Sequence, residues 1–196
     1  MIIVITPYVE LNNRHIERLC NIEGQIAGVI LRTPMQTPHL ERWTLKLLAN
    51  GFPKSKVIIH TDLALAIKLG ISNVHFKEGD PRAAILKKEN PHYQVSMSTH
   101  SAARIRHAKI EQLDFVLFGH LFQTPSKPDL PPRTETEIAE ALAIDFPIVA
   151  LGGITADTVQ HVSSHFTGIA CISSAFTHEL QTFKRMVHDW SLKKVK

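Results

Sequence analysis

The segment 115–120 reads Phe-Val-Leu-Phe-Gly-His and has the pattern most suited to chemistry, because an apolar run ends on a glycine and then an imidazole. An apolar run without alternation is typical of a parallel strand that is covered on both faces. His120 would therefore stand at the carboxyl end of a buried strand, before the Thr-, Pro-, Ser- and Lys-rich stretch 122–129. A histidine placed there can carry a proton into a cleft, or it can cap the strand through a backbone hydrogen bond.

A second chemical signal comes from two small-residue segments nearer the C-terminus. Gly152 and Gly153 follow one apolar run, and Ser173 and Ser174 follow the next. Glycine lets the backbone approach an anion closely, and serine adds hydroxyl donors to the backbone N–H groups. These four residues predict a phosphate-binding cradle, with an ordinary tight turn as the alternative.

Eight apolar runs alternate with helical periodicity, which indicates parallel pairing of strands. Eight such units close most economically into a (β/α)8 TIM barrel, and an open doubly wound sheet is the alternative. With 196 residues, the chain is expected to form one compact domain over 1–196 with short loops. Strands are expected at about 2–7, 25–32, 56–61, 72–77, 94–98, 115–120, 147–151 and 168–173, and helices begin at capping residues or prolines before 14–23, 39–50, 82–90 and 159–165.

In a closed barrel the chemistry lies at the carboxyl ends of the strands. The polar and small residues at those ends form a restricted set, which includes His120 and the two small-residue segments. The others are 6–8, Arg32, Thr33, His60, Thr61, Asp62, Lys77, Asp80 and 98–100.

Composition narrows the function classes. The formal charge of +4 is spread over the chain and concentrates only in the tail 193–196, which is expected to be solvated, so an anionic small substrate fits better than nucleic acid. No apolar stretch approaches the roughly 20 residues of a membrane span, and the N-terminus lacks a leader pattern, so a cytoplasmic protein is expected. Cys20 and Cys171 are interpreted as small core residues of a reducing compartment.

Four segments together resemble the thiamine phosphate synthase/TenI superfamily: 95–101, 114–127, 151–155 and 168–174. The resemblance spans nearly the whole chain and implies a (β/α)8 barrel. Synthases of this superfamily carry proline directly after the glycine of the sixth strand, whereas the thiazole tautomerases of the TenI type carry histidine in the context Phe-Gly-His-Val-Phe. This chain reads Phe-Gly-His-Leu-Phe over 118–122, so it is similar to the tautomerase branch.

Departures from the synthase pattern support the same assignment. The synthase motif of Gln, Arg and Lys on the second strand is replaced here by Ile30, Arg32 and Pro34, so only the arginine is kept. The Asn-Asp pair after the third strand is replaced by His-Thr at 60–61, which removes a carboxylate that helps to hold magnesium on a diphosphate. Asp80 remains, but a single carboxylate makes a poor magnesium site.

The resemblance implies a tautomerase that aromatises a phosphorylated thiazole carboxylate by a proton shift, with no redox cofactor and no metal. Histidine exchanges protons near neutral pH, so His120 is the expected acid–base group. Arg32 is expected to hold the substrate carboxylate, Ser98 to hydrogen-bond nearby, and Lys127 to contact the phosphorylated ligand. Residual thiamine phosphate synthase activity and a non-catalytic regulatory or ligand-binding barrel are the alternatives.

The remaining histidines leave other questions open. His60, His100 and His120 all fall at expected strand ends and could ligate a metal, but no His-x-His pair occurs, which disfavours a metal-dependent hydrolase. His75 lies inside an apolar strand and is interpreted as a core histidine. Whether His60 or His100 assists His120 stays open, and so does the oligomeric state, since a homo-oligomer is compatible with the sequence.

Overall fold

The computed structural model describes residues 1–125, 127–177 and 179–195. Eight parallel strands pair in chain order, and β8 returns to β1, so the sheet is a closed barrel. This confirms the (β/α)8 prediction and excludes the open sheet. The strands are β1 (Ile2–Ile5), β2 (Gly28–Leu31), β3 (Val57–His60), β4 (Asn73–Phe76), β5 (Gln94–Thr99), β6 (Phe115–Gly119), β7 (Ile148–Leu151) and β8 (Gly168–Cys171).

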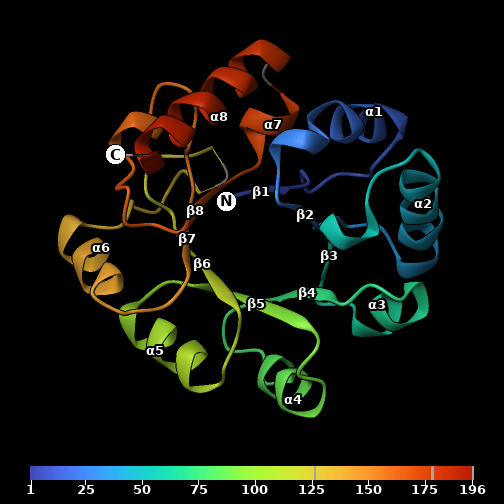
Figure 1. Cartoon of the computed structure of the whole chain (residues 1–196), viewed down its shortest axis with the longest axis horizontal. Helices are drawn as coiled ribbons and strands as arrows, with labels where there is room; N and C mark the ends of the chain where they lie inside the picture. The colour runs from blue at the N-terminus through green and yellow to red at the C-terminus, as the bar shows by residue number, and fades with distance from the viewer. Residues whose placement is uncertain (126, 178, 196) are drawn as a thin grey trace.

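The helices form an outer ring around the strands (Figure 1). Side chains at their N-termini satisfy first-turn N–H groups: Asn12 caps α1, Asp62 caps α3, Ser101 caps α5 and Thr134 caps α6. The helices are α1 (Asn13–Ile22), α2 (Thr37–Ala49), α3 (Leu63–Leu69), α4 (Arg82–Glu89), α5 (Ala102–Ile110), α6 (Glu135–Leu142), α7 (Ser173–Phe176) and α8 (Leu180–Val195), with 3-10 turns η1 (Glu23–Gln25), η2 (Lys54–Lys56) and η3 (Val159–His161).

The helix expected over 159–165 is wrong, because only the three residues of η3 are helical there. Carbonyl groups within and just after this segment accept hydrogen bonds from α8. Lys193 Nζ donates to the carbonyl oxygens of Gln160 and Val162, and Lys194 Nζ donates to those of Ser164 and Phe166.

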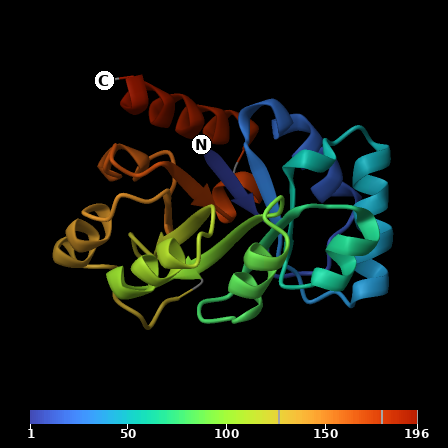
Figure 2. The same cartoon turned by 60° about the horizontal axis from the view of Figure 1, so that its bottom comes forward.

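These contacts also correct the expectation of a solvated tail. Lys193 and Lys194 are anchored to the β7–β8 connection, although the Lys194 residue as a whole remains exposed. The side chain of Val195 and all of Lys196 lie outside the described residues. Figure 2 shows α8 running close to the N-terminus of the chain. Met1 and the α8 residue Trp190 line the same pocket.

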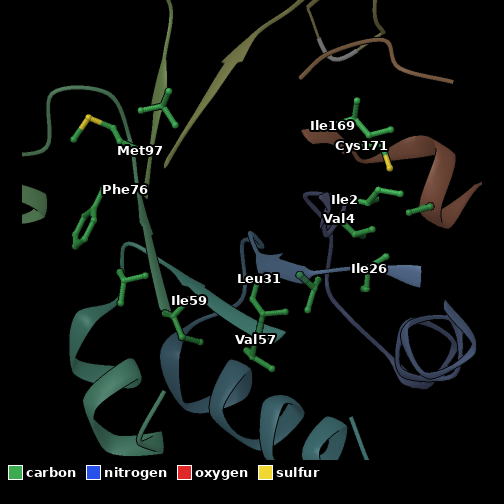
Figure 3. Close-up of a cluster of buried hydrophobic side chains, with 14 of the residues drawn as sticks. Ile2, Val4, Ile26, Leu31, Val57, Ile59, Phe76, Met97, Ile169 and Cys171 are labelled. Atoms are coloured by element: carbon green, nitrogen blue, oxygen red, sulfur yellow. The ribbon is translucent and has the colours of Figure 1, made fainter. Parts of the chain in front are cut away.

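Alternation along the strands divides the core into two clusters. One cluster fills the barrel interior with Ile3, Ile5, Ile30, Ile58, Phe115, Leu117, Val149 and Ala170. The larger cluster lies between the strands and the helices, and Figure 3 shows part of it, including Leu31, Val57 and Ile59. Most strands stop one or two residues before the expected ends, which leaves those residues free to line the mouth of the barrel.

Two smaller expectations can be compared with the structure. Cys171 is buried and Cys20 half-buried, and both thiols are free, as expected for core cysteines; burial raises the pKa of Cys171 to about 12. Within the described residues, the helices are too short or too polar to span a bilayer.

Candidate active site

His120 lies immediately after β6 and is only 3% exposed. Its Nε2 atom is 3.2 Å from the carbonyl oxygen of Leu130. Because a carbonyl oxygen can only accept, Nε2 must carry the proton, and the neutral ring then keeps a lone pair on Nδ1. Nδ1 is buried and has no hydrogen-bond partner among the described residues. The contact with Leu130 therefore leaves Nδ1 as the ring nitrogen that has no hydrogen-bond partner among the described residues.

Two glycines allow the backbone to pack closely around His120. A Cβ on Gly152 would lie 2.1 Å from His120 Cβ, and a Cβ on Gly119 would lie 2.0 Å from the Leu151 carbonyl oxygen. Gly152 also has a φ of +101°, which side chains other than glycine rarely adopt. The Gly-Gly pair thus has a packing role beside His120 that the sequence analysis missed.

Gly153 serves the same loop. Its φ is +66°, and a Cβ there would lie 2.7 Å from the carbonyl oxygens of Phe122 and Gln123. The β6–α6 loop therefore packs directly on the β7 loop, and the Phe122 N–H donates to the Gly152 carbonyl at 3.1 Å.

The four predicted cradle residues lie on two adjacent loops. Ser174 is buried, and its hydroxyl donates to the Ile154 carbonyl at 2.7 Å, which ties the loop after β8 to the loop after β7. That hydroxyl hydrogen is committed to the protein. The N–H groups of Gly152, Gly153 and Ser173 have no acceptor among the described residues. That these groups bind a phosphate stays a prediction.

Polar side chains line one sector of the barrel interior, on β3, β4 and β5. His75 Nδ1 is 2.8 Å from Ser96 Oγ, and His75 Nε2 is 2.9 Å from Ser98 Oγ. Burial lowers the pKa of His75 to about 3, helped by the charge of neighbouring His60. His75 is therefore a neutral core histidine, as predicted, and it orients the Ser98 hydroxyl. The rings of His60 and His75 stack at 6.0 Å.

Positively charged side chains surround His60 near the mouth of the barrel. Burial, followed by the positive charges of Arg32 and Lys77, lowers the pKa of His60 to about 4. Arg32 follows β2 and is exposed, with its guanidinium 4.6 Å from the centre of the Tyr8 ring. Since β2 and β6 are four strands apart in a ring of eight, Arg32 and His120 lie on opposite sides of the mouth. A ligand that contacts both must span it.

The carboxylates near the mouth are already paired. Asp80 Oδ2 accepts from Arg82 at 2.6 Å, and this hydrogen bond lowers the Asp80 pKa. Asp62 caps α3 and accepts from Thr37, while Glu78 accepts from His100. No group of three or more His, Cys, Asp or Glu residues within the described chain is arranged to hold a metal ion.

Lys127 lies in the β6–α6 loop, and its Nζ is 3.3 Å from His100 Nε2. Arg133 lies at the end of the same loop, and its Nη1 donates to the His100 carbonyl at 3.2 Å. The backbone N–H of Arg133 donates to the His120 carbonyl at 2.9 Å. Sequence reasoning singled out Lys127 but missed Glu78, Leu130 and Arg133. Only the polar character of segments after strands could have pointed to them.

The fold and the polar side chains define a (β/α)8 barrel whose candidate site lies at the carboxyl ends of its strands. The family model described as thiamine monophosphate synthase (TMP-TENI) matches residues 3–175, and the chain belongs to this family.

Relatives agree with that assignment, and a solved structure shares the fold. A thiamine-phosphate synthase from Lysinibacillus sphaericus is 34% identical over 123 residues, which cover 60% of this chain and 57% of that protein. One from Chlorobium phaeovibrioides is 32% identical over 142 residues, or 70% of this chain and 68% of that protein. The chain spans less than two thirds of the first of these. The thiamine phosphate pyrophosphorylase structure from Pyrococcus furiosus shares the fold, with a TM-score of 0.77 at 19% identity over 99% of this chain and 95% of that one.

Proposed function

We propose that this protein is a thiazole tautomerase of thiamine biosynthesis. The reaction breaks the C2–H bond of a non-aromatic thiazole carboxylate phosphate and forms a C–H bond at the exocyclic ylidene carbon, so that the ring becomes aromatic with no net oxidation. The observation that supports this reaction best is the buried His120 ring, whose Nε2 is committed to Leu130 and whose Nδ1 has no partner among the described residues.

One imidazole can perform both halves of the proton shift. Nδ1 would take the proton from C2, and the resulting imidazolium would keep its Nε2–H bond to the Leu130 carbonyl, which accepts equally well from the charged ring. The same nitrogen would then return the proton to the ylidene carbon. General acid–base catalysis typically contributes about 10²- to 10⁴-fold.

The surrounding groups fit a substrate with two anionic ends. Arg32 would hold the carboxylate on C2 and stabilise the charge that develops as the proton leaves. The N–H groups of Gly152, Gly153 and Ser173 would donate hydrogen bonds to the phosphate oxygens, with Lys127 adding a positive charge. Ser98 would hydrogen-bond to the bound ligand. The Ser174 hydroxyl would hold the two loops of the cradle together through its bond to Ile154. The backbone N–H of Ser174 would be a further donor to the phosphate.

Thiamine phosphate synthesis is the second candidate function, and the names of the relatives favour it. That reaction couples a thiazole phosphate to a hydroxymethylpyrimidine diphosphate and must bind the diphosphate that leaves. Here Ile30 is buried in the barrel interior, Pro34 offers no side-chain donor, and the Asp80 carboxylate is paired with Arg82. These residues oppose a diphosphate site.

A pair of assays on the purified protein separates the two functions. The first follows the ultraviolet spectrum of the non-aromatic thiazole carboxylate phosphate as it becomes aromatic. The second supplies aromatic thiazole phosphate, hydroxymethylpyrimidine diphosphate and magnesium, and measures thiamine phosphate. We expect rapid conversion in the first and none in the second. Turnover only in the second would assign the protein to the synthases, and turnover in neither, with phosphate still bound, would assign it to the non-catalytic barrels.

A further inference from the structure

Glu78 and His100 form a pair next to the candidate site, on the loops after β4 and β5. Glu78 Oε2 is 2.8 Å from His100 Nδ1, and Oε1 accepts from the His100 backbone N–H at 3.0 Å. A carboxylate accepts from Nδ1 only if that nitrogen carries the proton. The two hydrogen bonds to Glu78 therefore fix the orientation and the tautomer of the His100 ring, and they leave a lone pair on Nε2.

That lone pair faces a cation. Lys127 Nζ lies 3.3 Å from His100 Nε2 and donates to it. An ammonium group has three donor hydrogens and sits on a flexible stem, so one fixed hydrogen bond restricts its position and leaves two hydrogens for an anion. His100 is thus arranged to hold Lys127 rather than to accept a proton from a substrate.

The same residue is linked to the loop that carries His120. Arg133 Nη1 donates to the His100 carbonyl at 3.2 Å and to Glu137 Oε1 at 2.8 Å. The backbone N–H of Arg133 donates to the His120 carbonyl. The β6–α6 loop is therefore fastened to His100 at two points, through Lys127 and through Arg133.

We propose that Glu78 and His100 are positioning residues that hold the Lys127 ammonium over the mouth of the barrel, where it binds the phosphate of the substrate. This inference rests on the anion-binding role proposed for Lys127. It assigns to Glu78 and His100 an effect on substrate affinity and not on proton transfer.

Two substitutions of His100 separate its two hydrogen bonds. His100→Asn keeps an amide donor for Glu78 but places nothing within reach of Lys127. His100→Gln places an amide oxygen near the position of Nε2 and so retains an acceptor for the lysine. The measurements are KM and kcat for the tautomerase reaction, and calorimetric Kd values for inorganic phosphate and for the aromatic thiazole carboxylate phosphate. His107→Asn, on the exposed face of α5, is the matched control.

We expect His100→Asn to raise KM and both Kd values roughly 10-fold, with kcat within about 2-fold of the wild type. We expect the same changes in Lys127→Ala. The double variant should be no weaker than Lys127→Ala alone, because both changes remove one interaction. His100→Gln should restore most of the affinity, and Glu78→Gln should lie between. Thermal unfolding of each variant checks that the fold is intact.

Three results would overturn the inference. If Lys127→Ala weakens binding and His100→Asn does not, the lysine is positioned by other groups. If His100→Asn lowers kcat at unchanged KM, His100 takes part in proton transfer. If Lys127→Ala leaves both Kd values unchanged, the lysine does not bind the anion. The Kd values remain measurable if the protein has no tautomerase activity, so failure of the proposed reaction is distinguished from failure of this inference.

Discussion

His75 and His120 are both buried imidazoles, 2% and 3% exposed, yet their hydrogen bonding differs. Both nitrogens of His75 are bonded to serine hydroxyls, and burial holds its pKa near 3. His120 has one nitrogen bonded to a carbonyl and the other unpartnered within the described chain. A buried polar atom without a partner is costly, so a protein keeps one where a ligand or solvent will satisfy it.

The difference follows from where each residue lies. His75 is inside β4, where the neighbouring strand supplies Ser96, in register with His75, and Ser98, two residues further along. His120 comes one residue after β6 ends, under a loop that reaches it through the Leu130 carbonyl. Strand neighbours satisfy a side chain completely, whereas a loop past the strand end satisfies it in part. Position at the strand end, and not burial, therefore distinguishes the histidine proposed to carry the proton from the core histidine.

The largest effect is expected at His120. His120→Gln keeps an amide donor for Leu130 but has no basic nitrogen, so kcat should fall about 10²- to 10⁴-fold with the fold intact. His120→Asn should lose the same factor and also the hydrogen bond to Leu130. Steady-state kinetics with His107→Gln as control measure this. A kcat within 3-fold of the wild type in His120→Gln would show that His120 is a strand cap.

The converse change at His75 should affect stability and not chemistry. His75→Leu leaves the hydroxyls of Ser96 and Ser98 without their partner in the barrel interior, which costs about 1–3 kcal/mol for each unsatisfied group. We expect the free energy of unfolding in urea to fall by about 2–4 kcal/mol, while kcat of the folded protein changes by less than 10-fold. His75→Gln, which can still bond one serine, should lose less. A 100-fold loss of kcat in His75→Leu would contradict the distinction between the two histidines.

Gly152 tests how closely the His120 ring depends on its neighbour. Gly152→Ala adds a Cβ that would meet His120 Cβ at 2.1 Å on a backbone with a φ of +101°. Gly51→Ala is the matched control, because Gly51 has a φ of +87° but nothing within 4 Å of the added Cβ. Both should lose about 1–2 kcal/mol of stability from the backbone.

Only Gly152→Ala should also displace the imidazole, with a fall in kcat of at least roughly 10-fold, since misplacement by about 1 Å can cost 10²-fold. Urea unfolding and steady-state kinetics on both variants give the comparison. Equal kcat values in the two alanine variants would show that His120 does not depend on the space at Gly152.

The fold could be predicted from the sequence because its signals are local. Uninterrupted apolar runs, capping residues and strict alternation specify a parallel barrel. The helix expected over 159–165 is only a 3-10 turn, and the carbonyls of 160, 162 and 164 accept from Lys193 and Lys194, some 30 residues further along the chain. No local pattern records such a long-range contact.

The site could be predicted only in its strand-end residues. His120 and Arg32 follow apolar runs, and in the structure both lie just past the ends of their strands, while their roles stay predictions. The partners that define their chemistry, such as Leu130 and Glu78, contribute a backbone carbonyl or a carboxylate from a loop, and any residue type offers a carbonyl. The packing role of Gly152 beside His120 likewise depends on the register of β6 and β7, which the sequence does not state.

The smallest effect concerns the pH dependence of stability, to which the neutral histidines of the barrel interior contribute. The pKa values of His60 and His75 are lowered to about 4 and about 3, so the unfolded chain binds more protons than the folded chain as pH falls below about 6.5. Their contribution is complete above pH 7 and is lost as pH falls toward the folded pKa values. The slope should reach at most about 1.4 kcal/mol per pH unit for each histidine.

Urea unfolding between pH 7 and pH 5 isolates this term, because the carboxylates whose pKa values are lowered, Asp80 and Glu137, lose their contribution only at lower pH. His60→Asn should reduce the slope of unfolding free energy against pH by the contribution of one histidine. The pKa of His15 is also lowered, and its contribution to that slope should be unchanged in the variant. The tautomerase comparison sharpens the result. If His60→Asn flattens the stability profile while the pH profile of kcat is unchanged, His60 is a neutral wall of the site and His120 alone carries the proton; a shifted kcat profile would make His60 a second participant.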